Sequence, residues 1–241
     1  MGSKAHQAFS DNLGDIGALC GIYQATEGID NESLVKSSDD TIEVVLRSAI
    51  VLLITYWEAY IEDITAEAII VIAENLGDPD ALPKGLKKSI LGELKKDNND
   101  MASWKLAGNG WKILLLDRLP VLTKDRNWSF NSPKSLPTKK FIETALGISD
   151  IRKAWDSEWG SSEQYSEYLD KLVAIRGEIA HRGRLSKKLN RKFVNDSVRF
   201  VASLVVLTDQ KINAEVNKLS GVPIFEKERG QKYQIGSRLF S

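Results

Sequence analysis

The chain has 241 residues, no formal net charge and an apolar content of 42%, which is ordinary for a soluble globular protein with a substantial core. Because the charges balance, any affinity for nucleic acid has to come from a local basic patch. One cysteine excludes an internal disulfide and a cysteine-based zinc site, and two histidines leave little for another metal site. We therefore expect neither a metal nor a cofactor.

The longest apolar run, from Ala49 to Tyr56, lies between Arg47 and Glu58. A run of this length is too short to span a bilayer, which takes about 20 apolar residues in a helix. The N-terminus shows no signal-peptide pattern. The sequence therefore predicts a cytoplasmic protein without a membrane partner.

The first half of the chain predicts a helical hairpin. A weak helical pattern covers about residues 5–26, and a long pattern follows over about residues 42–76. Apolar residues recur three and four positions apart along the second pattern, and further apolar residues predict burial on more than one side. Residues 39–41 (Asp-Asp-Thr) supply N-cap chemistry at its start, and residues 77–79 (Gly-Asp-Pro) end it.

The middle of the chain is less regular. Residues 78–163 hold five of the six prolines and only short helical patterns. These patterns lie near residues 84–96, 111–119, 138–146 and 148–158. The sequence therefore predicts an insertion between two long helical hairpins.

The second hairpin is predicted by one helical stripe over residues 164–183 and another helix over about residues 189–219. The tail after Gly221-Val222-Pro223 is expected to form a short strand or to be disordered. Together these patterns predict an all-α protein. We expect an up-and-down helical bundle with a partly irregular helical insertion between the two long hairpins.

The segment IRGEIAHRG, residues 175–183, carries the strongest candidate chemistry. Gly183 stands where a C-cap glycine belongs, which places His181 in the last helical turn. The partial negative charge of a helix C-terminus favours a protonated side chain there, so His181 is a usable proton donor near neutral pH. A histidine at this position is also often only a capping group.

Arg176 lies five residues before His181, roughly 7.5 Å along the axis and about 140° around an ideal helix. The two side chains therefore do not share a face. They would converge on one phosphate only if the last turn were distorted or if a second copy of the helix completed the site. Gly177 costs roughly 1 kcal/mol relative to alanine inside a helix, but it leaves room for a partner helix or a ribose-phosphate.

This pair suits cleavage of a phosphodiester by the 2′-hydroxyl of RNA. Histidine transfers protons at the attacking or leaving oxygen, and arginine stabilises the charge that builds up on the phosphorus group. Six cations with no acid among them follow within eleven residues, and they either seat an RNA backbone or form a solvated loop. These cations are Arg182, Arg184, Lys187, Lys188, Arg191 and Lys192.

Glu58 is an acid midway along the most apolar predicted helix. Arg47 falls on the same face three turns earlier but is too far away to touch it within the helix. Glu58 and Glu62 share a face, yet two carboxylates without a third ligand make a poor metal site. We expect Glu58 to make a structural polar contact with the helix that ends at His181.

Three segments together resemble the HEPN superfamily (higher eukaryotes and prokaryotes nucleotide-binding): LRSAIVLLITYWEAYIEDI, FNSPKSLPTKKFIETALGISDI and IRGEIAHRG. The resemblance covers about residues 40–215 and is closest to the bacterial ribonuclease-like branch, which is seen among toxin–antitoxin and phage-defence genes. The hallmark of the family, an arginine, four to six residues and a histidine, falls on Arg176 and His181. The residue after this arginine is commonly polar in the family, and here it is Gly177.

The resemblance implies a metal-independent endoribonuclease that leaves 2′,3′-cyclic phosphate ends and acts as a toxin or defence effector. It also implies a homodimer in which two motifs share one cleft, with RNA as substrate and a cognate antitoxin or defence-system protein as a further partner. We expect residues 1–220 to form one HEPN-like domain, with the insertion at about residues 78–163, and residues 221–241 to form a tail.

Two other hypotheses stay open at this point. Some HEPN relatives are inactive, so the chain is alternatively a binding module for RNA, nucleotide or a partner protein. A third hypothesis is an adaptor bundle that assembles a larger complex.

Overall fold

The structure is a computed structural model that describes residues 2–27, 35–120, 130, 132–158, 160–185 and 188–226. The regular elements of this part of the chain are all helical, which confirms the predicted all-α class. The α-helices are α1 (Lys4–Glu27), α2 (Val35–Asn75), α3 (Lys84–Leu94), α4 (Gly110–Leu116), α6 (Ser135–Leu146), α7 (Ser162–Arg182) and α8 (Arg191–Ser220). Three short 3₁₀ helices are η1 (Pro79–Ala81), η2 (Ala102–Leu106) and η3 (Ile151–Trp155).

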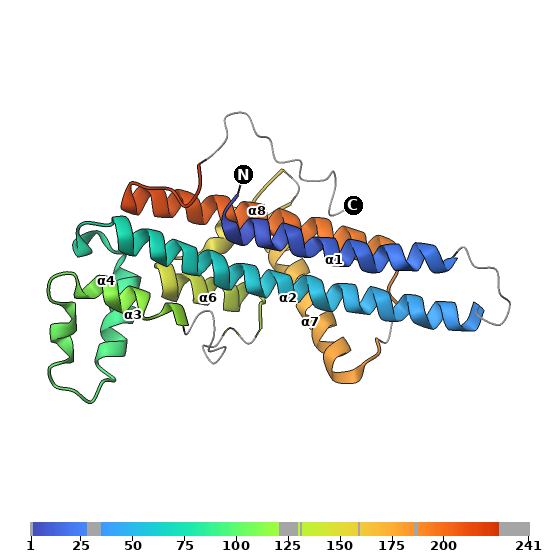
Figure 1. Cartoon of the computed structure of the whole chain (residues 1–241), viewed down its shortest axis with the longest axis horizontal. Coiled ribbons are helices and arrows are strands. Elements are labelled where there is room, and N and C mark those ends of the chain that lie inside the picture. Colours follow the sequence, from blue (N-terminus) through green and yellow to red (C-terminus); the bar gives the residue numbers. More distant parts are fainter. Residues whose placement is uncertain are drawn as a thin grey trace.

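The long helix α2 is the centre of the bundle. Figure 1 shows α1, α2 and α8 lying lengthwise beside one another, with α7 running obliquely to them. α2 contacts α1, α8, α7, α4 and α6. Its side chains at Ile50, Leu53, Trp57, Ile61 and Ile64 are fully buried. The predicted burial of this helix on more than one side is therefore confirmed.

The predicted start of α2 is wrong. The helix begins at Val35, so the proposed N-cap residues Asp39, Asp40 and Thr41 lie inside it. Aspartate and threonine each cost at most about 0.7 kcal/mol relative to alanine inside a helix, which does not suffice to stop one. The predicted end holds, because α2 stops at Asn75.

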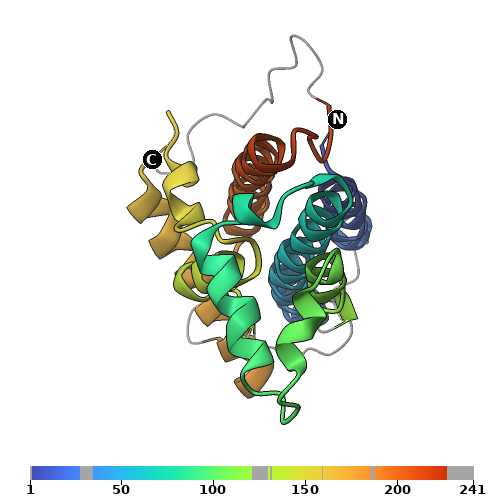
Figure 2. The ribbon, with the colours of Figure 1, turned by 90° about the vertical axis from the view of Figure 1, so that its left-hand side faces the viewer.

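The segment between the hairpins divides into two parts. α3, η2 and α4 form a lobe that projects from one end of the bundle, and Figure 2 views the bundle from that end. α6 and η3 instead pack inside, where α6 contacts α2 and α7 and η3 contacts α8. The predicted short helices near residues 84–96, 111–119 and 138–146 are present as α3, α4 and α6.

The pattern at residues 148–158 forms the 3₁₀ helix η3. Trp155 at its end is fully buried, and its indole Nε1–H donates to Thr208 Oγ1 of α8 over 3.0 Å. Its ring also lies edge-on to Trp57 of α2, with the ring centroids 6.3 Å apart. η3 therefore completes the core between α2 and α8.

The described start of the tail folds back onto α8. The backbone N–H groups of Ile224 and Phe225 both donate to Asn213 Oδ1, over 2.7 and 3.2 Å. Asn213 Nδ2 donates in turn to the Phe225 carbonyl over 3.1 Å. Residues up to 226 form no strand here, and the remainder of the predicted tail lies outside the described residues.

By length and composition, Thr41–Asn75 is the helix of the described chain that is long and apolar enough to cross a membrane, and an 18-residue stretch of it has a mean hydropathy of 1.6. The apolar run used in the sequence analysis understates this segment. Core helices of soluble bundles meet the same criterion; α2 contacts five other helices, and 44% of this apolar stretch is buried.

Candidate functional site

The helix α7, which carries the Arg–His segment, has well-defined ends. Ser161 and Gln164 form a capping box at its start, in which each side chain accepts a hydrogen bond from the backbone N–H of the other. Gly183 ends the helix in the left-handed region at φ 68°, and its N–H donates to the Ile179 carbonyl over 2.9 Å. The predictions that Gly183 is the C-cap and that His181 lies in the last turn are confirmed.

Arg176 faces α2. Its Nη2 lies 3.7 Å from Glu58 Oε2, and the two side chains are 31% and 23% exposed. The polar contact predicted between Glu58 and the helix that ends at His181 is therefore present. The pair forms at the edge of the bundle, where the arginine keeps access to solvent.

A second contact from α2 holds the end of α7, and the sequence analysis did not identify it. Arg47 Nη1 donates to the carbonyl of Gly183, and Arg47 Nε donates to the Glu43 carbonyl over 3.2 Å. A positive charge at this point complements the helix C-terminus. The feature of the sequence that indicated this contact was the eleven-residue spacing of Arg47 and Glu58. It places both residues on the face of α2 that contacts α7.

The structure places the remaining residues of the segment at the surface. His181 and Arg182 are exposed in the last turn of α7. A Cβ atom added at Gly177 would meet nothing within 4 Å, so the space beside this residue is open in a single protomer. α7 stays α-helical through Arg182, and its last turn is not distorted. The regular last turn therefore keeps the separation of about 140° between Arg176 and His181 that an ideal helix gives.

The basic run after α7 is divided by the fold. Arg182, Arg184, Lys188 and Lys192 are all exposed, but Lys192 is paired: its Nζ lies 2.8 Å from Asp196 Oδ2, one turn along α8. Arg191 is half-buried, and Lys187 lies outside the described residues. The run has no acid in the sequence, but the helix brings one to Lys192. The exposed cations nearest to His181 are therefore the better candidates for contact with phosphate.

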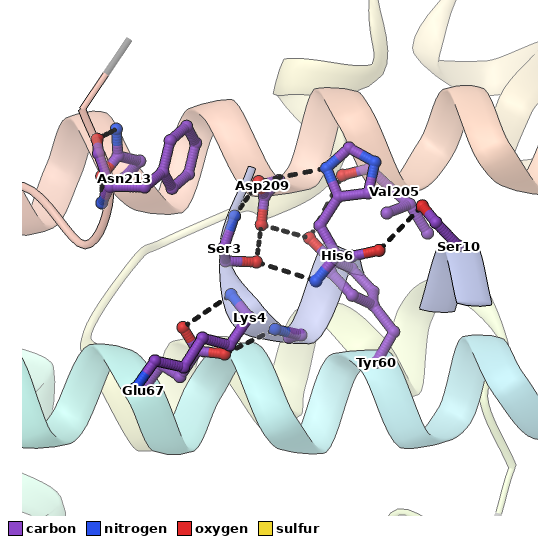
Figure 3. Close-up of polar contacts among 11 residues, drawn as sticks. Ser3, Lys4, His6, Ser10, Tyr60, Glu67, Val205, Asp209 and Asn213 are labelled. Atoms are coloured by element: carbon purple, nitrogen blue, oxygen red, sulfur yellow. Dashed lines mark hydrogen bonds and ion pairs between the residues drawn. The ribbon is translucent and has the colours of Figure 1, made fainter. Parts of the chain in front are cut away.

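A separate cluster of polar side chains lies where α1 begins, and sequence reasoning missed it (Figure 3). The Asp209 carboxylate of α8, 1% exposed, accepts from Ser3 N over 3.1 Å and from Ser3 Oγ over 2.5 Å. His6 Nδ1 lies 3.4 Å from the same carboxylate, and the Tyr60 hydroxyl donates to it over 3.3 Å. Burial, and then the charge of Asp209, raise the pKa of Tyr60 well above its usual value.

Glu67 of α2 completes this cluster by accepting from the backbone N–H groups of Lys4 and Ala5, over 3.2 and 2.6 Å. Burial raises the pKa of Glu67 although these N–H groups oppose the shift. Ser3 Oγ accepts from His6 N and donates to Asp209, so no histidine activates this hydroxyl. The cluster anchors the N-terminus of α1 and does not form a nucleophilic site.

Among the residues that the structure describes, no group of three or more His, Cys, Asp or Glu side chains is placed to hold a metal ion. The charged and titratable side chains of the Arg–His segment are Arg176, Glu178, His181 and Arg182, and Glu58 of α2 lies against Arg176. This set can transfer protons and stabilise an anion.

A family model described as RiboL-PSP-HEPN matches residues 24–214, a span that includes Glu58, Arg176 and His181. The chain belongs to the HEPN superfamily. HEPN domains are all-α, have RNA-related functions and are often ribonucleases that bind RNA and dimerise. No curated protein and no solved structure matches the chain.

Proposed function

We propose that this HEPN protein is a metal-independent endoribonuclease in which the α7 helices of two protomers act on one phosphodiester. The observation that carries the proposal is the arrangement of α7. An unbroken helix holds Arg176 against Glu58 and presents His181, exposed, in its last turn. One protomer keeps these side chains on different faces, and the open space beside Gly177 leaves room for a second helix.

The reaction uses the 2′-hydroxyl of the RNA itself. One His181 accepts the 2′-hydroxyl proton as the 2′-oxygen attacks phosphorus, and the His181 of the second protomer donates a proton to the departing 5′-oxygen. The phosphorus–5′-oxygen bond breaks, which leaves a 2′,3′-cyclic phosphate and a 5′-hydroxyl. Arg176 stabilises the negative charge that builds up on the phosphoryl oxygens.

Two residues of α2 position this machinery. Glu58 directs the guanidinium of Arg176, and Arg47 fixes the last turn of α7 through the Gly183 carbonyl. Arg182, Arg184 and Lys188 add positive charge for the RNA backbone next to that turn. In the cell we propose a toxin or defence effector that a cognate partner protein restrains.

The decisive experiment is cleavage of single-stranded RNA by purified protein in EDTA, followed by analysis of the product ends. We expect 2′,3′-cyclic phosphate and 5′-hydroxyl ends, and no cleavage where the scissile position carries a 2′-deoxyribose. His181→Ala should lower the rate about 10²- to 10⁴-fold, and Arg176→Ala about 10²- to 10³-fold. Ends with a 5′-phosphate, or activity that requires added Mg²⁺, would refute the mechanism.

One observation favours a second function, a non-catalytic RNA-binding module. Gly177 supplies no polar side chain where the family commonly has one, so a group that orients the substrate is missing. Wild-type protein that binds RNA and cuts none under any condition would establish this alternative. Gly177→Asn would then be the first variant to test for gained activity.

A further inference from the structure

A cavity of about 250 Å³ opens beside the Arg–His segment, between α7 and the start of α8. Two of its lining residues are neighbours of the candidate catalytic pair along α7. Ile175 directly precedes Arg176, and Glu178 lies three residues before His181. Glu178 and His181 lie about 60° apart around α7, so whatever occupies this cavity is close to the His181 that would act on the phosphodiester, whereas Arg176 faces α2 about 200° away from Glu178.

Four of the eight residues that line the cavity are apolar. Ile175, Leu185, Leu189 and Phe193 line it, and each is half-buried. Phe193 contributes an aromatic ring, and its position in the first turn of α8 is fixed by the N-cap residue Asn190. Nucleobases stack on aromatic side chains such as Phe193, and each of the four bases can do so.

The other four lining residues are polar or charged. Asn190 Oδ1 accepts from Phe193 N over 2.8 Å, which leaves the amide NH₂ of Asn190 as a donor. Glu178 offers a carboxylate acceptor and disfavours a phosphate inside the cavity. Lys171 and Lys188 also line the cavity and are exposed, so their charges favour an anion on its solvent side. An apolar lining with one donor, one acceptor and two exposed cations fits a base attached to a sugar-phosphate chain.

We infer that this cavity seats one unpaired base of the RNA, next to the phosphodiester held by Arg176 and His181; this inference rests on the proposed function. The volume is below the roughly 300–1,000 Å³ of pockets for drug-sized ligands, so it suits a single ring system and not a whole cofactor. A base in a duplex is stacked and paired and cannot enter it. The substrate class is therefore single-stranded RNA or a loop with a splayed base.

The test measures binding and needs no cleavage. Wild-type protein is titrated with each of the four nucleoside 5′-monophosphates and with ribose 5-phosphate, and binding is followed by NMR shifts of the backbone amides. We expect the best nucleotide to bind about 5- to 100-fold more tightly than ribose 5-phosphate, because stacking contributes only when a base is present. Equal affinities for nucleotides and ribose 5-phosphate would overturn the inference, since the protein would then bind the phosphate and not the base.

Two variants assign the binding to this cavity. Leu189→Trp fills it and should remove the advantage of nucleotides over ribose 5-phosphate. Phe193→Leu keeps an apolar side chain without the ring and should lower nucleotide affinity about 5- to 100-fold. The matched control is Leu91→Trp in a cavity of about 240 Å³ between α3 and α4, which should change nothing. A nucleotide advantage that survives in Leu189→Trp and Phe193→Leu would overturn the assignment.

Failure of this inference and failure of the proposed function are distinguishable. Wild-type protein that cuts RNA but binds ribose 5-phosphate as well as nucleotides refutes the base site and leaves the nuclease. Base-dependent binding without cleavage refutes the nuclease and leaves the cavity as a site for RNA bases.

Discussion

The ion pair between Glu58 and Arg176 links α2 to α7, and its strength can be worked from the structure. Unit charges 3.7 Å apart attract by about 4.5 kcal/mol at an effective dielectric constant of 20. Most of this is offset, because both side chains are partly exposed and the distance exceeds that of a good hydrogen bond. Exposed pairs measure roughly 0.2–1 kcal/mol, and the partial burial here places this pair near the upper end, at about 0.5–1 kcal/mol.

A double-mutant cycle measures this pair directly. Glu58→Gln, Arg176→Gln and the double variant are unfolded in urea, and the coupling energy follows from the four free energies of unfolding. The cycle is needed because a single substitution reports on everything that the side chain touches. Glu74→Gln, an exposed acid near the end of α2, is the control and should stay within about 0.5 kcal/mol of wild type.

The ion pair between Glu58 and Arg176 should also affect kcat/KM. If Glu58 positions Arg176 for the transition state, Glu58→Gln lowers kcat/KM by the coupling energy, about two- to fivefold, while Glu74→Gln leaves it unchanged. A coupling energy below about 0.2 kcal/mol together with wild-type kcat/KM in Glu58→Gln would refute the positioning role.

Three further predictions follow from the structure. Gly177→Leu should weaken the homodimer, because it fills the open space beside Arg176; an unchanged dimer mass by light scattering at tens of micromolar would show that this face is not the interface. Neutralising Arg184 and Lys188 together should flatten the slope of log affinity for single-stranded RNA against log salt by about 0.7 per contact. Lys192→Gln should change this slope less, because Lys192 is already paired with Asp196. A larger change in Lys192→Gln would contradict the division of the basic run. The pKa of Tyr60 is raised in the folded protein, so the unfolded tyrosine ionises first as pH rises. The contribution of Tyr60 to the free energy of unfolding is therefore complete below a pH of about 10 and is lost as pH rises further. Tyr60→Phe should flatten the fall in the free energy of unfolding above that pH, and an unchanged fall would show that other groups cause it.

Most of the fold was predictable because helical periodicity is a local signal. The stripe on α7, the Gly183 cap and the two long hairpins depend on residues within a few turns of each other. The start of α2 was not predictable from cap residues, because an aspartate such as Asp39 costs at most about 0.7 kcal/mol relative to alanine inside a helix and does not stop one.

The candidate site was predictable in part. The Arg–His spacing and the geometry of an ideal helix indicated that the pair converges only with a distorted last turn or a second copy of the helix, and the last turn of α7 is regular. The contact of Arg47 with the Gly183 carbonyl and the Asp209 cluster were not predictable, because each joins residues more than 130 positions apart. Spacing along one helix shows which residues share a face and does not show what that face meets.

The contact between Arg47 and Gly183 can form only late in the synthesis of the chain. The two residues are 136 positions apart, and a ribosome that adds about 5–20 residues per second needs roughly 7 to 27 s to travel between them. Until then, α2 has emerged without the helix that carries Arg176 and His181. A chain that terminates before residue 176 lacks both contacts of α7 with α2, together with Arg176 and His181, so incomplete products of that length lack the proposed cutting site.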